Sequence, residues 1–275
     1  MFDAHPPSPT HQRSHGRAAV ALSRRSGAIR LDGLVQEGSA KAFLPRVHRA
    51  VPEVVFLNTS GGLTGGDRLA LTVDLGASAQ AVATTQTAER AYAAGGAAAS
   101  VTVAAQVGAG GRLDWLPQET ILYEGSDLDR QTTIDLAADA TCLMAEMVIL
   151  GRHAMGETLR EARLRDARVV RRAGRPVWAE TLRLDAGTLA RGGDAAVLGG
   201  ARAFAVIALI GPEAEDALPR LRAALDLPGV EAAASAWDGK CVARLMAPAG
   251  WPLRRAVART LAALREGPLP RVWQI

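Results

Sequence analysis

The chain has 275 residues, a mass of 28.7 kDa and a formal net charge of +4. This length can bury one large core and lies near the upper size of a single domain. Hydrophobic residues make up 48% of the sequence but aromatic ones only 4%, so we expect a core built mainly from Val, Leu and Ala. No apolar run approaches the roughly 18 residues that a bilayer requires, so we expect no membrane-spanning helix.

The positive charge does not predict a nucleic-acid partner. Such a site needs clustered charge with exposed aromatic residues, whereas the arginines between residues 163 and 175 are mixed with acids and aliphatic residues. We predict that they form a solvated strand-and-turn surface, with a partner-docking patch as the alternative. These residues are Arg163, Arg165, Arg168, Arg171, Arg172 and Arg175.

Residues 1–18 have the composition of a disordered arm, rich in Pro, Ser, His and Arg and without periodicity. The arm has no apolar signal segment, so we expect a cytoplasmic protein. Loose metal binding by its histidines, His5, His11 and His15, is the weaker alternative. The two cysteines, Cys142 and Cys241, have neither disulfide nor zinc spacing, and we expect each to be a small core residue.

Short alternating strands separated by glycines begin at about Ala18, and a strand–turn–strand pattern then repeats. It occurs at residues 73–77, 105–110 and 134–139, and the markers Leu75, Val107 and Leu136 are 32 and 29 residues apart. Residues 182–187 resemble a fourth copy. Such spacing predicts stacked β-coils, each burying a face on its neighbour. We therefore predict a mainly β, β-helix-like fold that forms one domain over residues 19–275.

Two helices are predicted, both in the C-terminal third. The first spans residues 212–225, with Pro219 in its first turn. The second spans residues 253–266 and ends at Gly267 and Pro268. Mixed β-structure with two late α-helices is the expected architecture.

A glycine-rich loop at residues 58–68 is the most unusual stretch of the sequence. Four of the six residues from Gly61 to Gly66 are glycines, and Asp67 follows directly. It lacks the Lys-Ser/Thr pair of a phosphate-binding loop, and a strand-like pattern follows it. We therefore predict no nucleotide site here.

Several acidic residues are flanked by apolar residues, Gly or Pro, which predicts that some are buried. They are Asp67, Glu119, Glu146, Glu157 and Glu180. A buried carboxylate is costly unless it is paired or binds a cation. Each acid is explained by a salt bridge to an arginine such as Arg68, Arg152 or Arg160. The alternative is that the set lines a polar route for a divalent ion. Carboxylates hold a divalent transition-metal ion more weakly than imidazole or thiolate, which suits transit.

Nucleophilic catalysis has little support, because the sequence has no G-x-S-x-G motif. A β-coil protein with paired carboxylates is also compatible with a carbohydrate-active enzyme. Such enzymes bind sugars on exposed aromatic residues, and this chain has only 5 Trp and 2 Tyr. The carbohydrate enzyme remains the alternative function.

Several motifs in a fixed order resemble the urease accessory protein UreD family, also called UreH. They are residues 60–68 (SGGLTGGDR), 83–88 (ATTQTA), 115–122 (WLPQETIL), Glu146, Gly151-Arg152, 155–157 (MGE) and 270–273 (PRVW). Their order and spacing resemble the family over about residues 25–275.

The resemblance implies a β-helix-like body with two helices and no enzymatic activity. It implies a scaffold that docks on the structural subunits of apo-urease and recruits UreF, which holds the nickel-carrying GTPase UreG. No cofactor is expected to bind tightly, and Ni²⁺ is expected only in transit through an internal passage.

By family position, the resemblance assigns that passage to Asp67, Thr84, Glu119, Glu146 and Glu180. Asp67 would lie beside the glycine-rich loop, where missing side chains would leave room for a hydrated ion. Thr84 would supply a neutral oxygen, and the glutamates would act as successive weak ligands.

Overall fold

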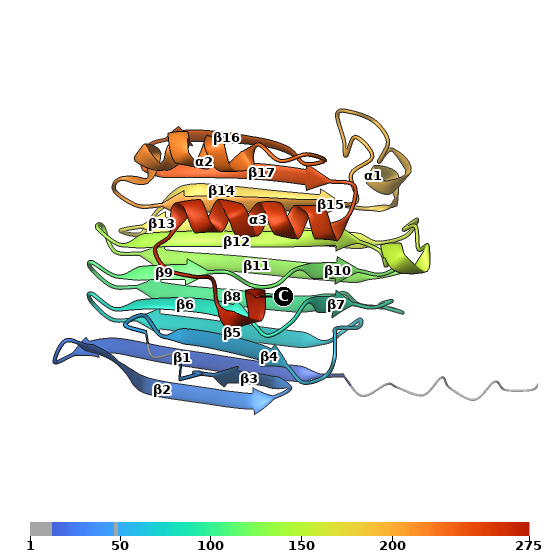
Figure 1. The fold of residues 1–275 in the computed structure, drawn as a ribbon. Coiled ribbons are helices and arrows are strands. Elements are labelled where there is room, and N and C mark those ends of the chain that lie inside the picture. The colour runs from blue at the N-terminus through green and yellow to red at the C-terminus, as the bar shows by residue number, and fades with distance from the viewer. Residues whose placement is uncertain (1–12, 47–48, 275) are drawn as a thin grey trace, which may run out of the picture.

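The computed structural model describes residues 13–46 and 49–274. In these residues the chain forms two β-sheets packed face to face, with the two longer helices on the outer side of the larger sheet (Figure 1). The coils rise from the hairpin of β1 (His15–Arg25) and β2 (Ala28–Gly38) at one end to the hairpin of β16 (Glu231–Trp237) and β17 (Lys240–Ala247) at the other (Figure 1). The mainly β, β-helix-like fold predicted from the sequence is confirmed.

Within the described residues, the first sheet has seven strands. In spatial order they are β14 (Arg175–Leu184), β13 (Arg163–Arg172), β11 (Asp127–Leu136), β8 (Ala99–Val107), β5 (Arg68–Leu75), β1 (His15–Arg25) and β2 (Ala28–Gly38). The strands from β13 to β1 pair in parallel, and β14 and β2 close the two ends in antiparallel.

The second sheet has ten strands in the same described ranges. Eight follow the order β16 (Glu231–Trp237), β17 (Lys240–Ala247), β15 (Ala203–Ile210), β12 (Thr141–Leu150), β9 (Arg112–Trp115), β6 (Gln80–Thr85), β4 (Glu53–Asn58) and β3 (Ala40–Phe43). The other two are β10 (Thr120–Leu122), which pairs with β12, and β7 (Glu89–Ala91), which pairs with β10.

The predicted repeat corresponds to the coils. Leu75 pairs in register with Val107, and Val107 with Leu136. The next rung, however, places Arg172 of β13 beside Leu136. The fourth copy predicted at residues 182–187 is therefore wrong. Leu182 lies in β14, which runs antiparallel to β13, and the coil that continues the repeat ends on an arginine.

The helices lie late in the chain, as predicted, with shifted ends. α2 (Leu218–Leu225) follows the 3₁₀ turn η2 (Ala214–Ala217), and Pro219 lies in its first turn. α3 (Gly250–Leu264) begins three residues before the predicted start and ends two before the predicted end. A third, five-residue helix, α1 (Ala186–Ala190), was not predicted. The other 3₁₀ turns are η1 (His153–Met155) and η3 (Arg271–Trp273).

Two apolar clusters hold the structure together. One fills the space between the sheets, and the other lies between the outer face of the ten-stranded sheet and α2 and α3. In β5, for example, Leu69, Leu71 and Val73 alternate inward. Both cysteines are buried, as predicted.

The N-terminal boundary differs from the prediction. β1 begins at His15, so residues 15–18, assigned to a disordered arm, are strand residues, and β1 pairs with β5. Residues 1–12 of that predicted arm lie outside the described residues. Among the described residues, no helix is both long and apolar enough to cross a membrane.

Candidate functional site

A layer of charged side chains lies inside the structure, between the two sheets. Arg130 of β11, Asp166 and Arg168 of β13, and Glu146 of β12 are all at most 6% exposed. All four occupy inward positions on their strands, and Met144 and Val148 flank Glu146 on the same face. The strand alternation that builds the core therefore also brings these four charges together.

The four buried groups neutralise one another. Arg130 binds Asp166 with Nε donating to Oδ1 at 2.9 Å, and its Nη2 lies 3.2 Å from Glu146 Oε2. Arg168 donates to Asp166 and, from Nε at 2.5 Å, to Glu146 Oε2. Thr132 donates to Glu146 Oε1 at 3.0 Å. Two arginines and two acids leave no net charge in this part of the interior.

The pKa of Glu146 reports the strength of this arrangement. Burial alone would raise that pKa, but the charges of Arg130 and Arg168, and the hydrogen bonds from Arg168 and Thr132, outweigh burial and lower it to about 2. Glu146 is therefore ionised at neutral pH.

The layer reaches solvent through Glu180 of β14. Arg168 Nη1 lies 3.7 Å from Glu180 Oε1, and Arg244 of β17 donates to Glu180 Oε2. The Arg244 side chain is 60% exposed, whereas that of Arg168 is 3% exposed. The line Glu146–Arg168–Glu180–Arg244 thus runs from the interior to the surface, and it contains two of the five predicted passage residues.

Asp67 lies elsewhere, at the base of the glycine-rich loop. Its carboxylate accepts the backbone N–H groups of Ser14 at 2.7 Å and Thr64 at 2.8 Å, so it fixes the loop itself. The loop does not leave the room that the sequence analysis expected. A Cβ at Gly65 would lie 2.1 Å from Ala94 O, and one at Gly62 would lie 2.8 Å from Arg90 O. These glycines allow close backbone contact.

Glu89, which the sequence analysis did not single out, lies against this loop. Its carboxylate accepts hydrogen bonds from Asn58 Nδ2 at 3.3 Å and from the Arg90 backbone N–H. Burial raises the pKa of Glu89 to about 7. The nearby Asp67 charge adds slightly, and Asn58 and Arg90 oppose the shift. A glutamate just before an arginine gives no sequence signal for such a shift.

Thr84 and Glu119 share a third location, under the C-terminal segment on the outer face of the ten-stranded sheet. Thr84 donates to Leu116 O at 2.6 Å, and Trp273 Nε1 contacts both Thr84 Oγ1 and Leu116 O. Arg254 of α3 binds Glu119 at 2.7 Å and lies over the Trp273 ring. These contacts hold the end of the chain against the sheet.

The five predicted passage residues therefore occupy three places: Asp67 at the loop, Thr84 with Glu119 under the C-terminal segment, and Glu146 with Glu180 in the interior layer. Across residues 13–46 and 49–274, no three His, Cys, Asp or Glu side chains form a group able to hold a metal. Glu157 pairs with Arg152, as the salt-bridge interpretation predicted.

No sequence prediction placed Arg130, Asp166 or Arg168 in the site, and Arg168 was predicted to lie on a solvated surface. That prediction is wrong for Arg168, because strand alternation places it on the inward face with Leu164 and Val170. The same two-residue spacing from Leu128 to Ile134 contained the signal for Arg130.

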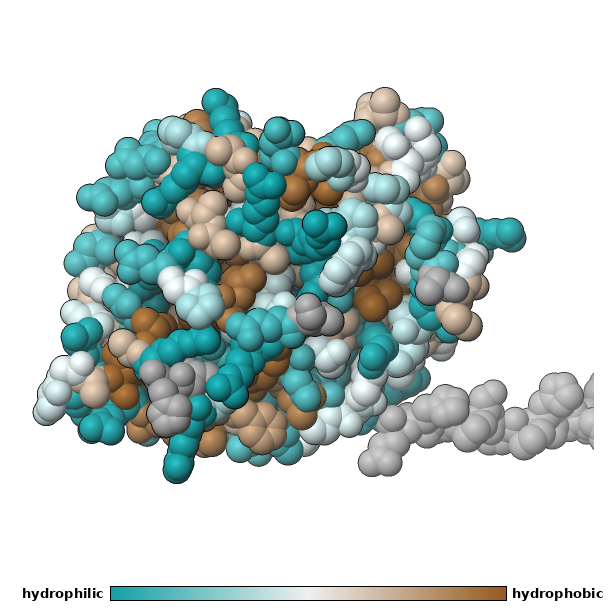
Figure 2. Space-filling model, in the orientation of Figure 1, coloured by the Kyte–Doolittle hydropathy of each residue, from teal (hydrophilic) through white to brown (hydrophobic). Residues whose placement is uncertain are grey.

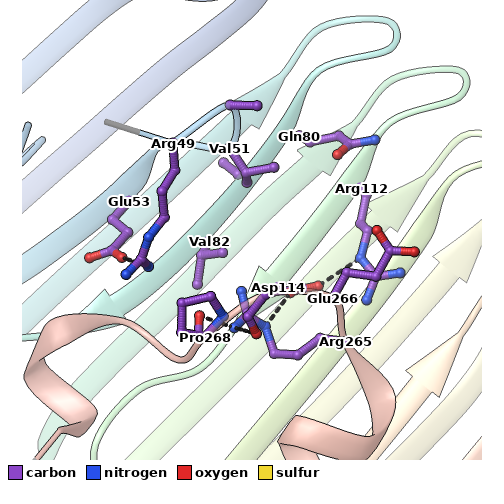
Figure 3. Close-up of a pocket in the computed structure, with 13 residues that line it drawn as sticks. Arg49, Val51, Glu53, Gln80, Val82, Arg112, Asp114, Arg265, Glu266 and Pro268 are labelled. Carbon is purple, nitrogen blue, oxygen red and sulfur yellow. Dashed lines mark hydrogen bonds and ion pairs between the residues drawn. The ribbon is translucent and has the colours of Figure 1, made fainter. Parts of the chain in front are cut away.

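A cavity of about 580 Å³ lies on the outer face of the ten-stranded sheet, beside the segment that follows α3 (Figure 3). Its walls combine apolar residues with three arginines, Arg49, Arg112 and Arg265. None of the predicted site residues lines it.

The surface on the side of α2 and α3 mixes hydrophobic and hydrophilic residues (Figure 2). Large exposed hydrophobic residues do occur next to the helices and at the strand edges. They include Trp251 at the start of α3, Trp237 at the end of β16, and Leu31 and Leu34 on the edge strand β2.

Comparison with known proteins gives a consistent result. The model of the family described as "UreD urease accessory protein" matches residues 14–274. A protein named "Urease accessory protein UreD" from Cereibacter sphaeroides (strain ATCC 17025) is 63% identical over 269 residues, which cover 98% of each chain. One of the same name from Paracoccus denitrificans is 54% identical over 275 residues, which cover 100% of this chain and 97% of the relative.

Proposed function

Because the chain belongs to the UreD family of urease accessory proteins, we propose that it docks on apo-urease, recruits UreF and the GTPase UreG, and helps pass nickel into the urease active site. The family resemblance inferred from the sequence motifs is confirmed. UreD is an accessory protein with a role in urease maturation and not a catalytic enzyme. The carbohydrate-active enzyme considered as an alternative is therefore set aside.

The interior charged layer is the observation that supports nickel passage. Glu146 and Glu180 supply carboxylate oxygens at two depths, with Arg168 between them and Arg244 at the surface. A divalent ion that enters from the surface meets Glu180 first and Glu146 second. Each carboxylate is already held by a guanidinium, so the ion must compete with an arginine for it.

That competition suits a cargo that must move on. A carboxylate with a free site binds a divalent ion without opposition, whereas one paired with a buried arginine loses a charge-assisted hydrogen bond when the ion arrives. The returning arginine then favours release of the ion. On this proposal, Glu146 and Glu180 are transient ligands, and Arg168 keeps either from retaining nickel.

Asp67, Thr84 and Glu119 remain part of the proposed route, but they differ in how far their present contacts leave them free to bind an ion. Glu119 is partly exposed beside Arg254 and resembles Glu180 in this respect. Thr84 already donates its hydroxyl to Leu116 O and accepts a hydrogen bond from Trp273 Nε1, so an ion would have to displace Trp273 from its oxygen. Asp67 is held by two backbone N–H groups, so its replacement would disturb the loop as well as any ion contact.

Partner docking is supported by the exposed hydrophobic residues. Trp251 is 57% exposed at the start of α3, and Leu31 and Leu34 lie on an 11-residue edge strand whose side chains are mostly exposed. Exposed apolar side chains that lie together are typical of contact surfaces, whereas single ones are common on any folded chain, so Leu31 and Leu34 on one strand carry more weight than Trp251. We propose that contacts with urease and UreF use the strand edges and the surroundings of the two late helices.

Glu180→Ala tests the route with little structural risk, because the glutamate is partly exposed and its partner Arg244 can be solvated. We expect the variant to form complexes with urease, UreF and UreG, and to lower the nickel content of urease at limiting nickel. The matched control is Asp129→Ala, which breaks an exposed ion pair with Arg165 between β11 and β13, away from the strand edges and the late helices. Full activation by Glu180→Ala, or loss of complex assembly, would contradict the assigned role.

A further inference from the structure

The cavity on the outer face of the ten-stranded sheet lies apart from the interior charged layer. Residues before and within β4 form one wall, β6 and β9 form the floor, and residues 265–268 form the other wall (Figure 3). At about 580 Å³, it falls within the range of small-ligand pockets, which is roughly 300 to 1,000 Å³.

Buried ion pairs shape this cavity. Asp114 accepts a hydrogen bond from Arg112 Nε at Oδ1 and from Arg265 Nε at Oδ2, both at 3.0 Å. On the opposite wall, Arg49 donates to Glu53 at 2.8 Å. The Asp114 and Glu53 side chains are 6% and 3% exposed, so each carboxylate is held in place by the guanidinium groups around it.

The lining holds three arginines and three acids, Glu53, Asp114 and Glu266, so it carries no net charge. Glu53 and Asp114 are the buried acids: Arg49 matches Glu53, and two arginines share the single carboxylate of Asp114, which leaves one guanidinium without a buried acid of its own. Glu266 lies exposed at the rim, where its charge is screened by water. Arg49 and Arg112 have side chains that are each 33% exposed and lie on opposite sides of Val51 and Val82 in Figure 3.

The rest of the lining is apolar, with Ala50, Val51, Val82 and Pro268 among its residues. Guanidinium groups bind carboxylates through parallel N–H donors, and apolar walls favour an apolar group beside the anion. We infer that this cavity binds a carboxylate carried on a short apolar stem, with Arg112 and Arg49 as its cationic groups. Such a group occurs on a free aliphatic acid and at the C-terminal residue of another protein chain. The inference does not depend on nickel transfer.

The test is titration of the purified full chain with N-acetyl-L-leucine. Binding is measured by calorimetry and by the shifts of the arginine Nε–H signals in nuclear magnetic resonance spectra. A ligand of this size is expected to bind with a dissociation constant on the order of millimolar. N-acetyl-L-leucine amide, which keeps the stem and lacks the charge, should bind about tenfold more weakly or worse. Comparison with 4-methylpentanoate separates the sources. Tighter binding of the N-acetyl amino acid supports a chain terminus, and tighter or equal binding of the free acid supports a small-molecule ligand.

Three variants locate the site. Arg112→Gln should weaken binding about tenfold. Ala50→Phe, at an exposed position, should block the cavity without removing a charge. Glu266→Gln should strengthen binding, because it removes a rim carboxylate. The matched control is Arg183→Gln, on an exposed position of β14 outside the cavity.

Circular dichroism checks that each variant is folded, and if Arg112→Gln does not fold, Ala50→Phe decides the matter. The inference is overturned if the acid and the amide bind equally, or if Ala50→Phe binds the acid as the wild type does. It is also overturned if the wild type shows no binding at ligand concentrations about tenfold above the expected dissociation constant.

Discussion

Replacement of Glu146 by Gln is expected to destabilise the protein strongly, because it removes one of two carboxylates that neutralise two buried guanidinium groups. Gln keeps a similar volume and can still accept the Thr132 hydrogen bond, so the change is mainly one of charge. Arg130 and Arg168 would then share the buried Asp166, and Glu180, which lies 3.7 Å from Arg168 but is already paired with Arg244, would compensate the second charge only in part.

Two independent arguments give the magnitude. Removing one partner of a buried ion pair lowers the free energy of unfolding by about 3 to 5 kcal/mol. The pKa of Glu146 falls from 4.5 to about 2 on folding, and at 1.36 kcal/mol per pKa unit this corresponds to stabilisation on the order of 3 kcal/mol. Because the folded pKa is the lower one, this stabilisation is fully present above pH 4.5 and disappears as the pH falls towards 2.

Urea unfolding followed by circular dichroism measures the effect. At pH 7 the Glu146→Gln variant should lose about 3 kcal/mol of unfolding free energy. The difference from the wild type should stay constant down to about pH 4.5 and narrow below it. A loss below about 1 kcal/mol at pH 7, or a difference that grows as the pH falls, would refute the reasoning.

Three further predictions concern other parts of the molecule. Glu89→Gln should leave stability unchanged near pH 4.5 and raise it at pH 8 by on the order of 3 kcal/mol, measured by urea unfolding. The reason is that the folded pKa of Glu89, about 7, lies above the unfolded value, so the wild type loses stability as the pH rises between the two. A benefit confined to low pH would contradict this. Trp273→Ala should lower the free energy of unfolding by about 3 kcal/mol, because the buried ring also donates to Leu116 O and lies under Arg254. An unchanged urea midpoint would show that the C-terminal segment is not docked. Gly65→Ala should lower the midpoint of thermal unfolding, because the added Cβ would meet Ala94 O. Gly193→Ala, which adds a Cβ in open space, is the matched control and should leave the midpoint unchanged. Equal midpoints for the two variants would refute the packed loop.

The repeat of the fold could be predicted from the sequence because each coil ends on an apolar residue. Leu75, Val107 and Leu136 mark successive rungs in register. The next rung ends on Arg172, which is not apolar, and the fourth copy was therefore predicted at Leu182, which lies in an antiparallel strand. A sequence repeat therefore locates the coils only as long as the residue at the repeated position stays apolar.

The candidate site was predictable only in part. Glu146 and Glu180 were expected to be polar groups in an apolar context, and their pairing with arginines was one of the two interpretations. The identity of the partner was wrong, because Arg168 is 22 residues from Glu146 and meets it only when β13 packs against the opposite sheet. Spacing within a strand tells which face a residue occupies, but not which residue faces it across the core.

The expectation of open space beside Asp67 failed for a related reason. Glycines permit both a void and a close backbone approach, and the sequence cannot distinguish the two. The partner of the loop is β7 and the residues after it, about 30 positions later, with Leu63 N–H bound to Arg90 O and Tyr92 N–H bound to Leu63 O. The glycines serve that packing.

The most direct test of the central claim is the nickel content and activity of urease produced with its accessory proteins at limiting nickel, with this chain present, absent or carrying Glu180→Ala. The account predicts metal-poor, inactive urease without the chain, recovery on its re-expression, and assembled complexes with reduced metal content for the variant. Fully metallated urease without the chain would contradict the account, and full metallation with Glu180→Ala would contradict the proposed route through the interior layer.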